Sequence, residues 1–283
     1  MKKLIEYIRE AEEKKTAIAH FNISNSEMLE AIWRAAYKLK VPVVVGVSEG
    51  ERDFIGIKRA RALVISLREE FDFPIFLNAD HTYSLPRVNE VAEAKFDSVI
   101  FDGANLPFEE NISKTKECVL SAKALDSEIL VEGELGFIGQ SSKLLDKIPE
   151  GVVTTSPDDA KRFVEETKVD LFAPAVGNFH GQLRVGDEPI KADLVKQIRE
   201  VAGVPLVLHG GSGISDEDFI KAIDAGISMI HISTELRVAF RKGIEEAVKE
   251  MPDEVAPYKY LAKAVENVEK VAEARLKLFS KIK

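Results

Sequence analysis

The chain has 283 residues, of which 45% are hydrophobic and 31% charged, and a formal net charge of −9 at pH 7. This composition is typical of a globular protein, and the length permits one barrel-sized domain or two smaller ones. Acidic and basic residues are interspersed, as in KRFVEE at 161–166, so the charge pattern excludes a nucleic-acid footprint. We expect no nucleic-acid partner.

A single cysteine, Cys118, excludes an internal disulfide and is typical of a reducing compartment. It lies within the helical pattern of residues 112–125, which favours an inert, half-buried thiol over a nucleophile. No apolar stretch approaches membrane-spanning length, and residues 1–5 lead directly into an amphipathic helix instead of a signal-peptide core. We therefore expect a cytoplasmic protein with no membrane partner.

Short β-rich runs alternate along the chain with amphipathic helical patterns, which is typical of repeated βα units with parallel strands. The eight predicted strands are Thr16–Asn22, Val41–Ser48, Pro74–Asp80, Ser98–Asp102, Glu128–Gly133, Leu171–Val176, Pro205–His209 and Ser228–Ile232. The sequences SPDD at 156–159 and SDED at 215–218 indicate helix starts.

Eight such units in one chain predict an α/β protein of the (β/α)₈ TIM-barrel type, with a doubly wound open sheet as the alternative. No linker-like segment divides the chain, so residues 1–283 are expected to form a single domain. The stretch from about Ser233 to Lys283 is helical and longer than one barrel helix requires. These additional C-terminal helices favour a homo-oligomer, a homodimer or a homotetramer.

Polar side chains end all eight predicted strands, on the face where such barrels place functional groups. They are Asn22, Ser48, Asp80 with His81, Asp102, Glu134, His180, His209, and His231 with Ser233. Histidine is scarce in this chain, with five residues in all. One histidine alone is more often a structural residue, but His81, His180 and His209 on three separate strand ends predict a Zn²⁺ site.

Asp80 directly precedes His81, so the two side chains can divide proton transfer and metal binding between them. A carboxylate beside a divalent cation stays ionised near neutral pH and can act as a base; the alternative is a partner that only orients a histidine. The loop Gly210-Gly211-Ser212-Gly213 opens a helix and can hold an anion. Ser233 and Thr234, after strand eight, are interpreted equally well as phosphate donors or as a plain helix cap.

The chain resembles the class II, zinc-dependent ketose-bisphosphate aldolases, the fructose- and tagatose-bisphosphate aldolase family. The resemblance covers essentially the whole chain and is carried by AIAHFNISNSEMLEAI, VPVVVGVSEG, NADH, SVIFDGANLPFEENISKTK, VEGELGFIG, GNFHG, LHGGSGI and STELR. It implies that His81, His180 and His209 ligate a catalytic zinc. It also implies that Asp80 is the acid/base for the aldehyde or the C4 hydroxyl.

The resemblance further implies a site for a ketose phosphate and a monovalent cation, Na⁺ or K⁺, formed by Gly181, Gly210, Gly211, Ser212 and Gly213. Ser233 and Thr234 would complete the phosphate site. Asp102 and Glu134 match carboxylates around an alternative, inward zinc position, and Ser48 matches a residue of the V-S-x-G loop at the substrate. The implied activity is reversible cleavage of a ketose 1,6-bisphosphate, with fructose 1,6-bisphosphate expected first, to dihydroxyacetone phosphate and glyceraldehyde 3-phosphate.

The chain departs from the family pattern at three places. Residues 139–142 read GQSS where many members carry a loop glutamate that removes the donor proton. His231 stands at a family asparagine, and could act as a hydrogen-bond donor, a proton-transfer group or a further metal ligand; we expect a catalytic role. Asn78 replaces a histidine that is not a ligand. His20, at the end of the first strand, has no role implied by the resemblance.

Three alternatives are weighed against this function. A Schiff-base aldolase would need a lysine at a strand end, and none of the eight ends has one. A non-catalytic, stabilising barrel subunit agrees with the missing loop glutamate but not with the retained Asp80 and histidines. An aldolase for tagatose bisphosphate or another sugar phosphate stays open, because the sequence does not show which hydroxyl stereochemistry the site accepts.

Overall fold

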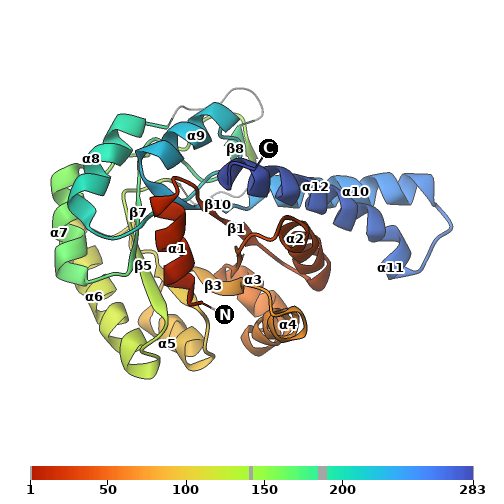
Figure 1. Ribbon diagram of the computed structural model, residues 1–283, viewed down its shortest axis with the longest axis horizontal. Coiled ribbons are helices and arrows are strands. Elements are labelled where there is room, and N and C mark those ends of the chain that lie inside the picture. Colours follow the sequence, from red (N-terminus) through yellow and green to blue (C-terminus); the bar gives the residue numbers. More distant parts are fainter. Residues whose placement is uncertain (1, 140–142, 184–189, 283) are drawn as a thin grey trace.

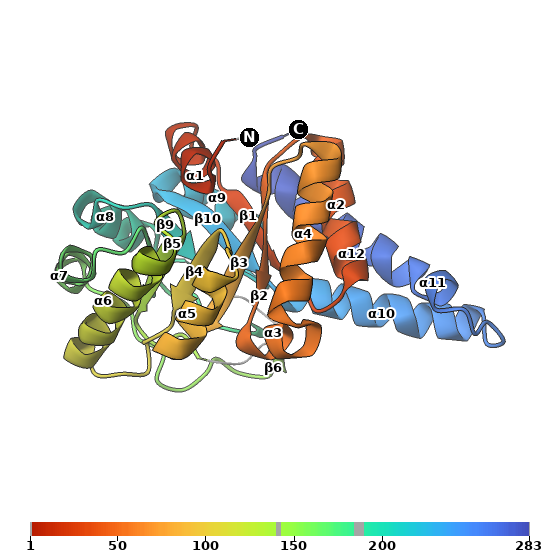
Figure 2. The ribbon, with the colours of Figure 1, turned by 90° about the horizontal axis from the view of Figure 1, so that it is seen from below.

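The computed structural model describes residues 2–139, 143–183 and 190–282, and its centre is a closed barrel of eight parallel strands (Figures 1 and 2). The barrel order is β1-β10-β9-β7-β5-β4-β3-β2, so neighbours in sequence are neighbours in space. The strands are β1 (Ile18–Asn22), β2 (Val43–Val47), β3 (Ile75–Thr82), β4 (Ser98–Phe101), β5 (Leu130–Leu135), β7 (Leu171–Pro174), β9 (Leu206–Leu208) and β10 (Ile227–Ile232). The predicted (β/α)₈ barrel is confirmed, and an open sheet is excluded by the pairing of β1 with β10.

One helix precedes the first strand and packs against the apolar end of the barrel, and the other helices follow the strands and lie around it. They are α1 (Leu4–Glu13), α2 (Ser26–Leu39), α3 (Glu49–Ile55), α4 (Ile57–Phe71), α5 (Leu85–Glu93), α6 (Phe108–Leu125), α7 (Pro157–Thr167), α8 (Ala192–Ala202), α9 (Asp216–Ala225), α10 (Thr234–Glu250), α11 (Pro257–Tyr260) and α12 (Ala262–Phe279). Both predicted helix starts are confirmed: the hydroxyls of Ser156 and Ser215 accept hydrogen bonds from the backbone N–H groups of Asp159 and Asp218. Among the described residues, no helix combines the length and hydropathy needed to cross a bilayer.

The barrel interior changes from apolar to polar along the strand direction. Its lower part is an apolar cluster that includes Ile18, Val44, Phe76, Val207 and Met229, together with Leu4 and Ile8 of α1. Because inward positions recur every second residue, the next inward layer holds polar side chains on the same strands. The site described below therefore rests on a packed apolar floor.

The C-terminal helices project from one side of the barrel (Figure 1). Helices α10 and α12 pack against each other, and at Gly243 a Cβ atom would lie 2.4 Å from the Cα of Ala264. At the barrel end of α12, the ring of Phe279 packs against Phe219 at 4.9 Å, and its carbonyl accepts from the N–H of Ala17. The predicted additional C-terminal helices are confirmed.

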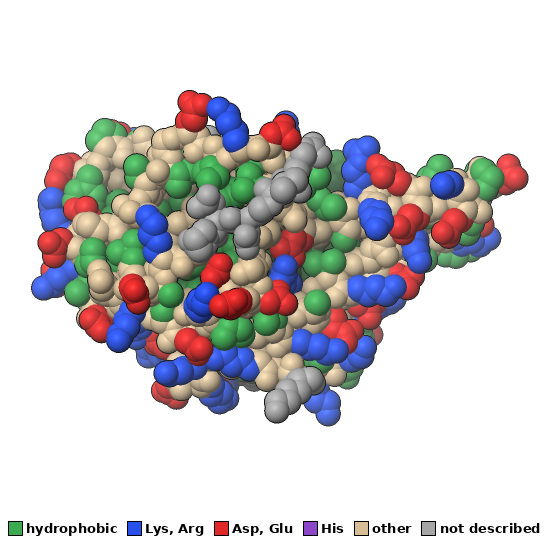
Figure 3. Space-filling model, turned by 90° about the horizontal axis from the view of Figure 1, so that it is seen from above, with side chains coloured by type: hydrophobic (Ala, Val, Ile, Leu, Met, Phe, Trp, Pro, Cys, Tyr) green, Lys and Arg blue, Asp and Glu red, His purple; other side chains and the backbone are tan. Residues whose placement is uncertain are grey.

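Acidic and basic side chains lie side by side on the face shown in Figure 3.

Two short strands lie outside the barrel. β6 (Leu144–Leu145) pairs in parallel with β8 (Gln182–Leu183), and the two belong to the loops that follow β5 and β7. The sequence analysis did not anticipate this pair, since two-residue strands carry no periodicity. The pair of β6 and β8 joins the segment after His180 to the segment that follows residue 142. The two loops therefore border the same end of the barrel.

Cys118 should resist alkylation in the folded protein. Its side chain is buried on α6, where burial raises the pKa of the thiol to about 12, so almost no thiolate is present at pH 8. We expect no mass increase with iodoacetamide at pH 8, and one modification per chain after denaturation in guanidinium chloride. Modification of the folded protein at the denatured rate would contradict the inert thiol that the sequence predicts.

Candidate active site

A β-bulge at the end of β3 places Asp80 and His81 side by side at the mouth of the barrel. The pairing of β3 with β4 shifts register between Ala79 and Thr82, and His81 has a φ of 39°, in the left-handed region. Such a backbone needs support. Buried Arg52, on α3, donates hydrogen bonds to the carbonyl oxygens of Val47 and Asp80 and to the hydroxyl of Thr82.

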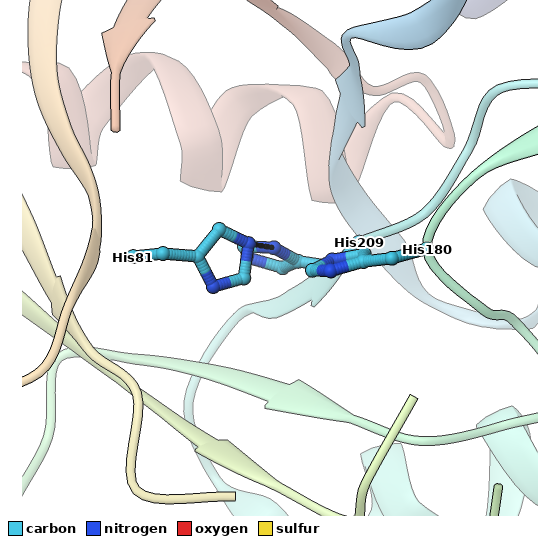
Figure 4. A group of neighbouring side chains, drawn as sticks. All are labelled: His81, His180 and His209. Carbon is cyan, nitrogen blue, oxygen red and sulfur yellow. Dashed lines mark hydrogen bonds between the residues drawn. The ribbon is translucent and has the colours of Figure 1, made fainter. Parts of the chain in front are cut away.

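Three histidines point toward one another above this bulge (Figure 4). His209 directly follows β9, and its Nδ1 lies 3.2 Å from Nε2 of His81. The ring of His180, in the loop after β7, lies 4.6 Å from the His81 ring and 6.0 Å from the His209 ring. One nitrogen of each residue lies within 4.8 Å of the others. The structure thus brings together the three residues predicted to bind zinc.

Asn178 connects the two loops that carry His180 and His209. Its Oδ1 accepts from the N–H of Val176, and its Nδ2 donates to the carbonyl oxygen of His209, at 2.8 and 3.0 Å. This turn also ends β7 before Val176, earlier than predicted, because the Val176 amide is used by the Asn178 side chain. Asn178 was not singled out by the sequence analysis.

Carboxylates fix which ring nitrogens of the triad face the cavity. His81 Nδ1 lies 2.9 Å from Asp102 Oδ2, and His209 Nε2 lies 2.7 Å from Glu132 Oε1. A proton on each of these nitrogens leaves a lone pair on His81 Nε2 and on His209 Nδ1, the two atoms that are 3.2 Å apart. Two lone pairs that face each other repel unless a proton or a cation lies between them. The donor set therefore fits a divalent ion such as Zn²⁺.

The electrostatic field of the site also favours a cation. Burial alone would lower the pKa of His81, but Asp80, Asp102 and Glu134 outweigh it and raise that pKa to about 10. Burial, followed by the charge on His81, lowers the pKa of His180 and of His209 to about 3. One positive charge is thus held among the three rings, and two of them present neutral nitrogens, the form that binds a metal.

Asp102 and Glu134, predicted as ligands of an inward zinc position, lie behind His81 and away from the cavity. The Oε2 atom of Glu134 is 3.6 Å from His81 Nδ1 and has no hydrogen-bond partner within the described chain. Burial and the nearby charge of Asp102 raise the pKa of Glu134 well above its usual range. In this arrangement Asp102 orients His81 through a hydrogen bond, Glu134 lies beside it without one, and a role of the two carboxylates as direct ligands stays a prediction.

Asp80 lies beside the triad with one oxygen held and one available. Asn22, at the end of β1, donates to Asp80 Oδ2 at 2.8 Å, while Asp80 Oδ1 lies 3.3 Å from Nδ1 of His231. Burial would raise the pKa of Asp80, but His81, followed by His231 and His20, lowers it well below its usual range. The group is therefore an ionised carboxylate at neutral pH, as predicted, with a free edge toward the cavity.

A cavity of about 250 Å³ opens over these side chains. Most residues of the predicted phosphate site line it: Ser48, Gly181, Gly210, Gly211, Ser212, Ser233 and Thr234. At Gly210, φ is 62° and a Cβ would lie 2.2 Å from the carbonyl oxygen of Phe179, so only glycine fits. Gly213, also predicted for this site, does not line the cavity. Its N–H donates instead to Glu235 Oε1 at 2.9 Å.

The hydroxyl of Ser233 does not cap α10. Ser212 fills that place instead, since its hydroxyl accepts from the N–H groups of Ser233 and Glu235, each at 3.3 Å. The hydroxyl of Ser233 is buried at the N-terminus of the 17-residue helix α10 and has no partner within the described chain. Of the two interpretations of Ser233, the structure removes the side-chain cap and leaves the anion donor.

The first turn of α10 also carries a guanidinium group that lines the cavity and that the sequence analysis missed. Arg237, one turn into α10, lines the cavity and donates to Glu51 Oε1 at 2.7 Å. Glu51 Oε2 accepts from the Ser48 hydroxyl at 2.9 Å and from Asn22. This buried carboxylate thereby ties together the ends of β1 and β2 and the start of α10, and it holds Arg237 at the edge of the cavity.

Comparison with known proteins agrees with this geometry. The family model for "Fructose-bisphosphate aldolase class-II" matches residues 2–283. A probable fructose-bisphosphate aldolase of Bacillus subtilis is 35% identical over 279 residues, covering 98% of this chain and 96% of that protein. The fructose-bisphosphate aldolase of Geobacillus stearothermophilus is 36% identical over 259 residues, covering 90% and 88% of the two chains.

A solved structure, the YdjI aldolase from Escherichia coli K12, superimposes with a TM-score of 0.81 at 32% identity, and covers 98% of this chain and 96% of that one. The chain therefore belongs to the class-II fructose-bisphosphate aldolase family. It is an aldolase of this metal-dependent class, and the resemblance noted from its sequence motifs is confirmed. Of the loop 139–142, where many members carry a glutamate, residues 140–142 lie outside the described residues.

Proposed function

We propose that this chain is a zinc-dependent aldolase that reversibly cleaves a ketose 1,6-bisphosphate, with fructose 1,6-bisphosphate as the expected substrate. The products are dihydroxyacetone phosphate and glyceraldehyde 3-phosphate. The observation that carries the proposal is the pair of facing nitrogens on His81 and His209, each oriented by a carboxylate, directly beside the ionised Asp80. The names of the relatives support the substrate.

The protein side chains divide the work of cleavage. Asp80 Oδ1 accepts the proton of the C4 hydroxyl, the C3–C4 bond breaks, and its electron pair stays on C3 of the ketone fragment. C3 then takes up a proton from solvent water, which completes dihydroxyacetone phosphate, and Asp80 releases its proton to solvent and is again a carboxylate. The zinc ion, when bound by His81, His180 and His209, supplies polarisation of the ketone carbonyl. Asn22 keeps the carboxylate of Asp80 in place throughout.

Two kinds of anion-binding group line the cavity and support a phosphorylated substrate with more than one phosphate. The backbone N–H groups of Gly181, Gly210 and Gly211, with the hydroxyls of Ser233 and Thr234, suit one phosphate, and Na⁺ or K⁺ beside them completes the proposed site. Arg237, with Ser48 nearby, suits the other phosphate. A site with only one group of anion-binding donors would favour a monophosphate.

The chain acts as a single domain of residues 1–283 in the cytoplasm, as a homodimer or homotetramer. Exposed apolar side chains at the tip of the projecting segment support self-association: Val255, in the loop between α10 and α11, and Tyr258, on α11, are 86% and 76% exposed. Charge on these helices is mixed, and salt bridges such as Lys270 to Glu266 cover their surface.

The test is a retro-aldol assay on fructose and tagatose 1,6-bisphosphates, with and without a chelator. We expect cleavage of fructose bisphosphate that is lost after dialysis against a chelator and restored by added Zn²⁺. Activity that persists when elemental analysis finds no metal would contradict the metal proposal. A protein that binds one zinc per chain and cleaves neither sugar would instead support the non-catalytic subunit.

A further inference from the structure

His20 and His231 lie side by side inside the barrel because β1 and β10 pair in register. His20 is opposite His231 in this pairing, and both residues are buried, at 0% and 5% exposure. Their rings stack in parallel, 3.5 Å apart with an interplanar angle of 5°. The stack is thus set by the backbone pairing that closes the barrel.

The ring of His20 is itself fixed from two further strands. Its Nε2 lies 3.2 Å from Oδ1 of Asn78, whose amide nitrogen donates to the Ser98 hydroxyl at 2.8 Å. On β2, a Cβ at Gly46 would lie 2.1 Å from the His20 ring, so the ring fills the space that this glycine leaves. Two positions that depart from the family pattern, Asn78 and His231, therefore contact the same residue, His20.

On the His231 side, the stack faces Asp80 and the cavity. Nδ1 of His231 is 3.3 Å from Asp80 Oδ1, and both residues line the cavity. At this distance the two groups attract each other, but Asp80 Oδ1 and both ring nitrogens of His231 have no aligned hydrogen-bond partner within the described chain. Buried polar atoms without partners cost stability, so they are usually matched by a ligand.

A shared metal ion does not explain these atoms. His20, Asp80 and His231 each offer a ligand atom within 4.8 Å of the others. However, the lone pair of an imidazole nitrogen lies in the ring plane, and two parallel rings 3.5 Å apart direct their lone pairs alongside each other. A common ion would have to lie well out of both planes. A polar group of the substrate meets the unpartnered atoms of His231 and Asp80 without this difficulty.

We propose that His231 and Asp80 together recognise the C4 hydroxyl of the substrate, and that His20 is a positioning residue that holds the plane of His231. This inference rests on the proposed function. The C4 hydroxyl donates a hydrogen bond to Asp80 Oδ1 and accepts one from an N–H of His231. These two bonds use the hydroxyl's hydrogen atom and one of its two lone pairs. Because both partners lie on one side of the cavity, the C4 epimer loses both hydrogen bonds. His231 is therefore the residue that sets the choice between C4-epimeric ketose bisphosphates.

The experiment measures binding of two non-cleavable probes, hexitol 1,6-bisphosphates that differ only at C4, to the zinc-loaded enzyme by calorimetry. The unmodified enzyme should bind one epimer more tightly. His231→Phe keeps the ring and removes both nitrogens, and should reduce the ratio of the two dissociation constants by roughly 10- to 100-fold, the loss of one or two hydrogen bonds to a charged site. Binding of dihydroxyacetone phosphate, which has no C4, should not change.

Two variants of His20 test the positioning role. His20→Phe keeps a ring beneath His231 and should keep most of the epimer discrimination, whereas His20→Leu removes the ring and should lose most of it. Met229→Leu is the matched control, since Met229 lies in the apolar layer one inward position below His231 on the same strand. It should lower the melting temperature without changing the ratio of dissociation constants.

Several results would overturn the inference. They are equal affinity of the unmodified enzyme for the two hexitols, unchanged discrimination in His231→Phe, and a second bound zinc that disappears in His231→Phe. Equal loss of discrimination in Met229→Leu would also count against it. An enzyme that discriminates between the hexitols through His231 but cleaves neither ketose would overturn the proposed function and leave this inference supported.

Discussion

Replacing His209 by alanine should lower zinc affinity by more than about 100-fold and abolish measurable cleavage. Removal of a partner that only orients a metal ligand costs about 10- to 100-fold in metal affinity, and loss of the ligand itself costs more. Competition with a chromogenic chelator measures the affinity directly. Glu132→Gln tests the residue that orients His209, because it keeps the shape of the side chain that accepts from His209 Nε2 and removes its charge. We expect its zinc affinity to fall by about 10- to 100-fold, less than that of His209→Ala.

Ser228→Ala is the control for His209→Ala. Ser228 is a buried polar residue on β10, the neighbouring strand, and its hydroxyl donates a hydrogen bond to the carbonyl of Leu206. Its substitution should leave zinc affinity unchanged. Equal zinc affinity of His209→Ala and the unmodified chain would show that the histidine triad is not the metal site.

Replacing Asp80 by asparagine should lower kcat by roughly 10²- to 10⁴-fold while the protein keeps its zinc. The amide cannot accept the hydroxyl proton, but it occupies the same space and can still contact Asn22. Because the pKa of Asp80 is held well below its usual range, the carboxylate is ionised throughout the neutral range. We therefore expect no loss of activity from protonation of Asp80 near neutrality, and any acid limb measured there should persist in the weakly active variant.

Asp97→Asn is the matched control for this substitution. Asp97 accepts hydrogen bonds from Arg68 and from the N–H of Leu77, away from the cavity. The variant should lose thermal stability and retain its kcat. A kcat of Asp80→Asn within twofold of the unmodified enzyme, with full zinc content, would exclude Asp80 as the proton acceptor.

The strand positions and the histidine triad could be predicted because they depend on local patterns. Short apolar runs that alternate with amphipathic helical patterns give the strands, and the barrel rule places their ends on one face, so His81, His180 and His209 meet. The predicted first strand, Thr16–Asn22, differs from β1 by two residues at its start. Because the strand still ends at Asn22 and side chains alternate between its two faces, this difference does not change which residues point into the barrel.

The roles of the residues one layer deeper were not predicted, although the period of a strand contains the signal. Glu132 precedes Glu134 by two positions, and Asn78 precedes Asp80 by two, so each pair faces the same side of its strand. The roles of Glu132 and His20 depend on contacts with β9 and β10, far away in the sequence. Neither the bulge at His81 nor the support from Arg52 leaves a local pattern, because both arise from pairing between strands.

The in-register contact between β1 and β10 has a consequence for how the enzyme matures during synthesis. His20 is made early and His231 late, so their stack forms only when the last strand of the barrel docks against the first. Closing so long a loop is among the slower steps of folding, because its entropy cost precedes the contacts that offset it. A nascent chain that stops before β10 contains His81, His180 and His209 but no closed barrel. We expect such chains to show neither tight zinc binding nor sugar discrimination, and to be prone to pairing through the open edges of β1 and β9.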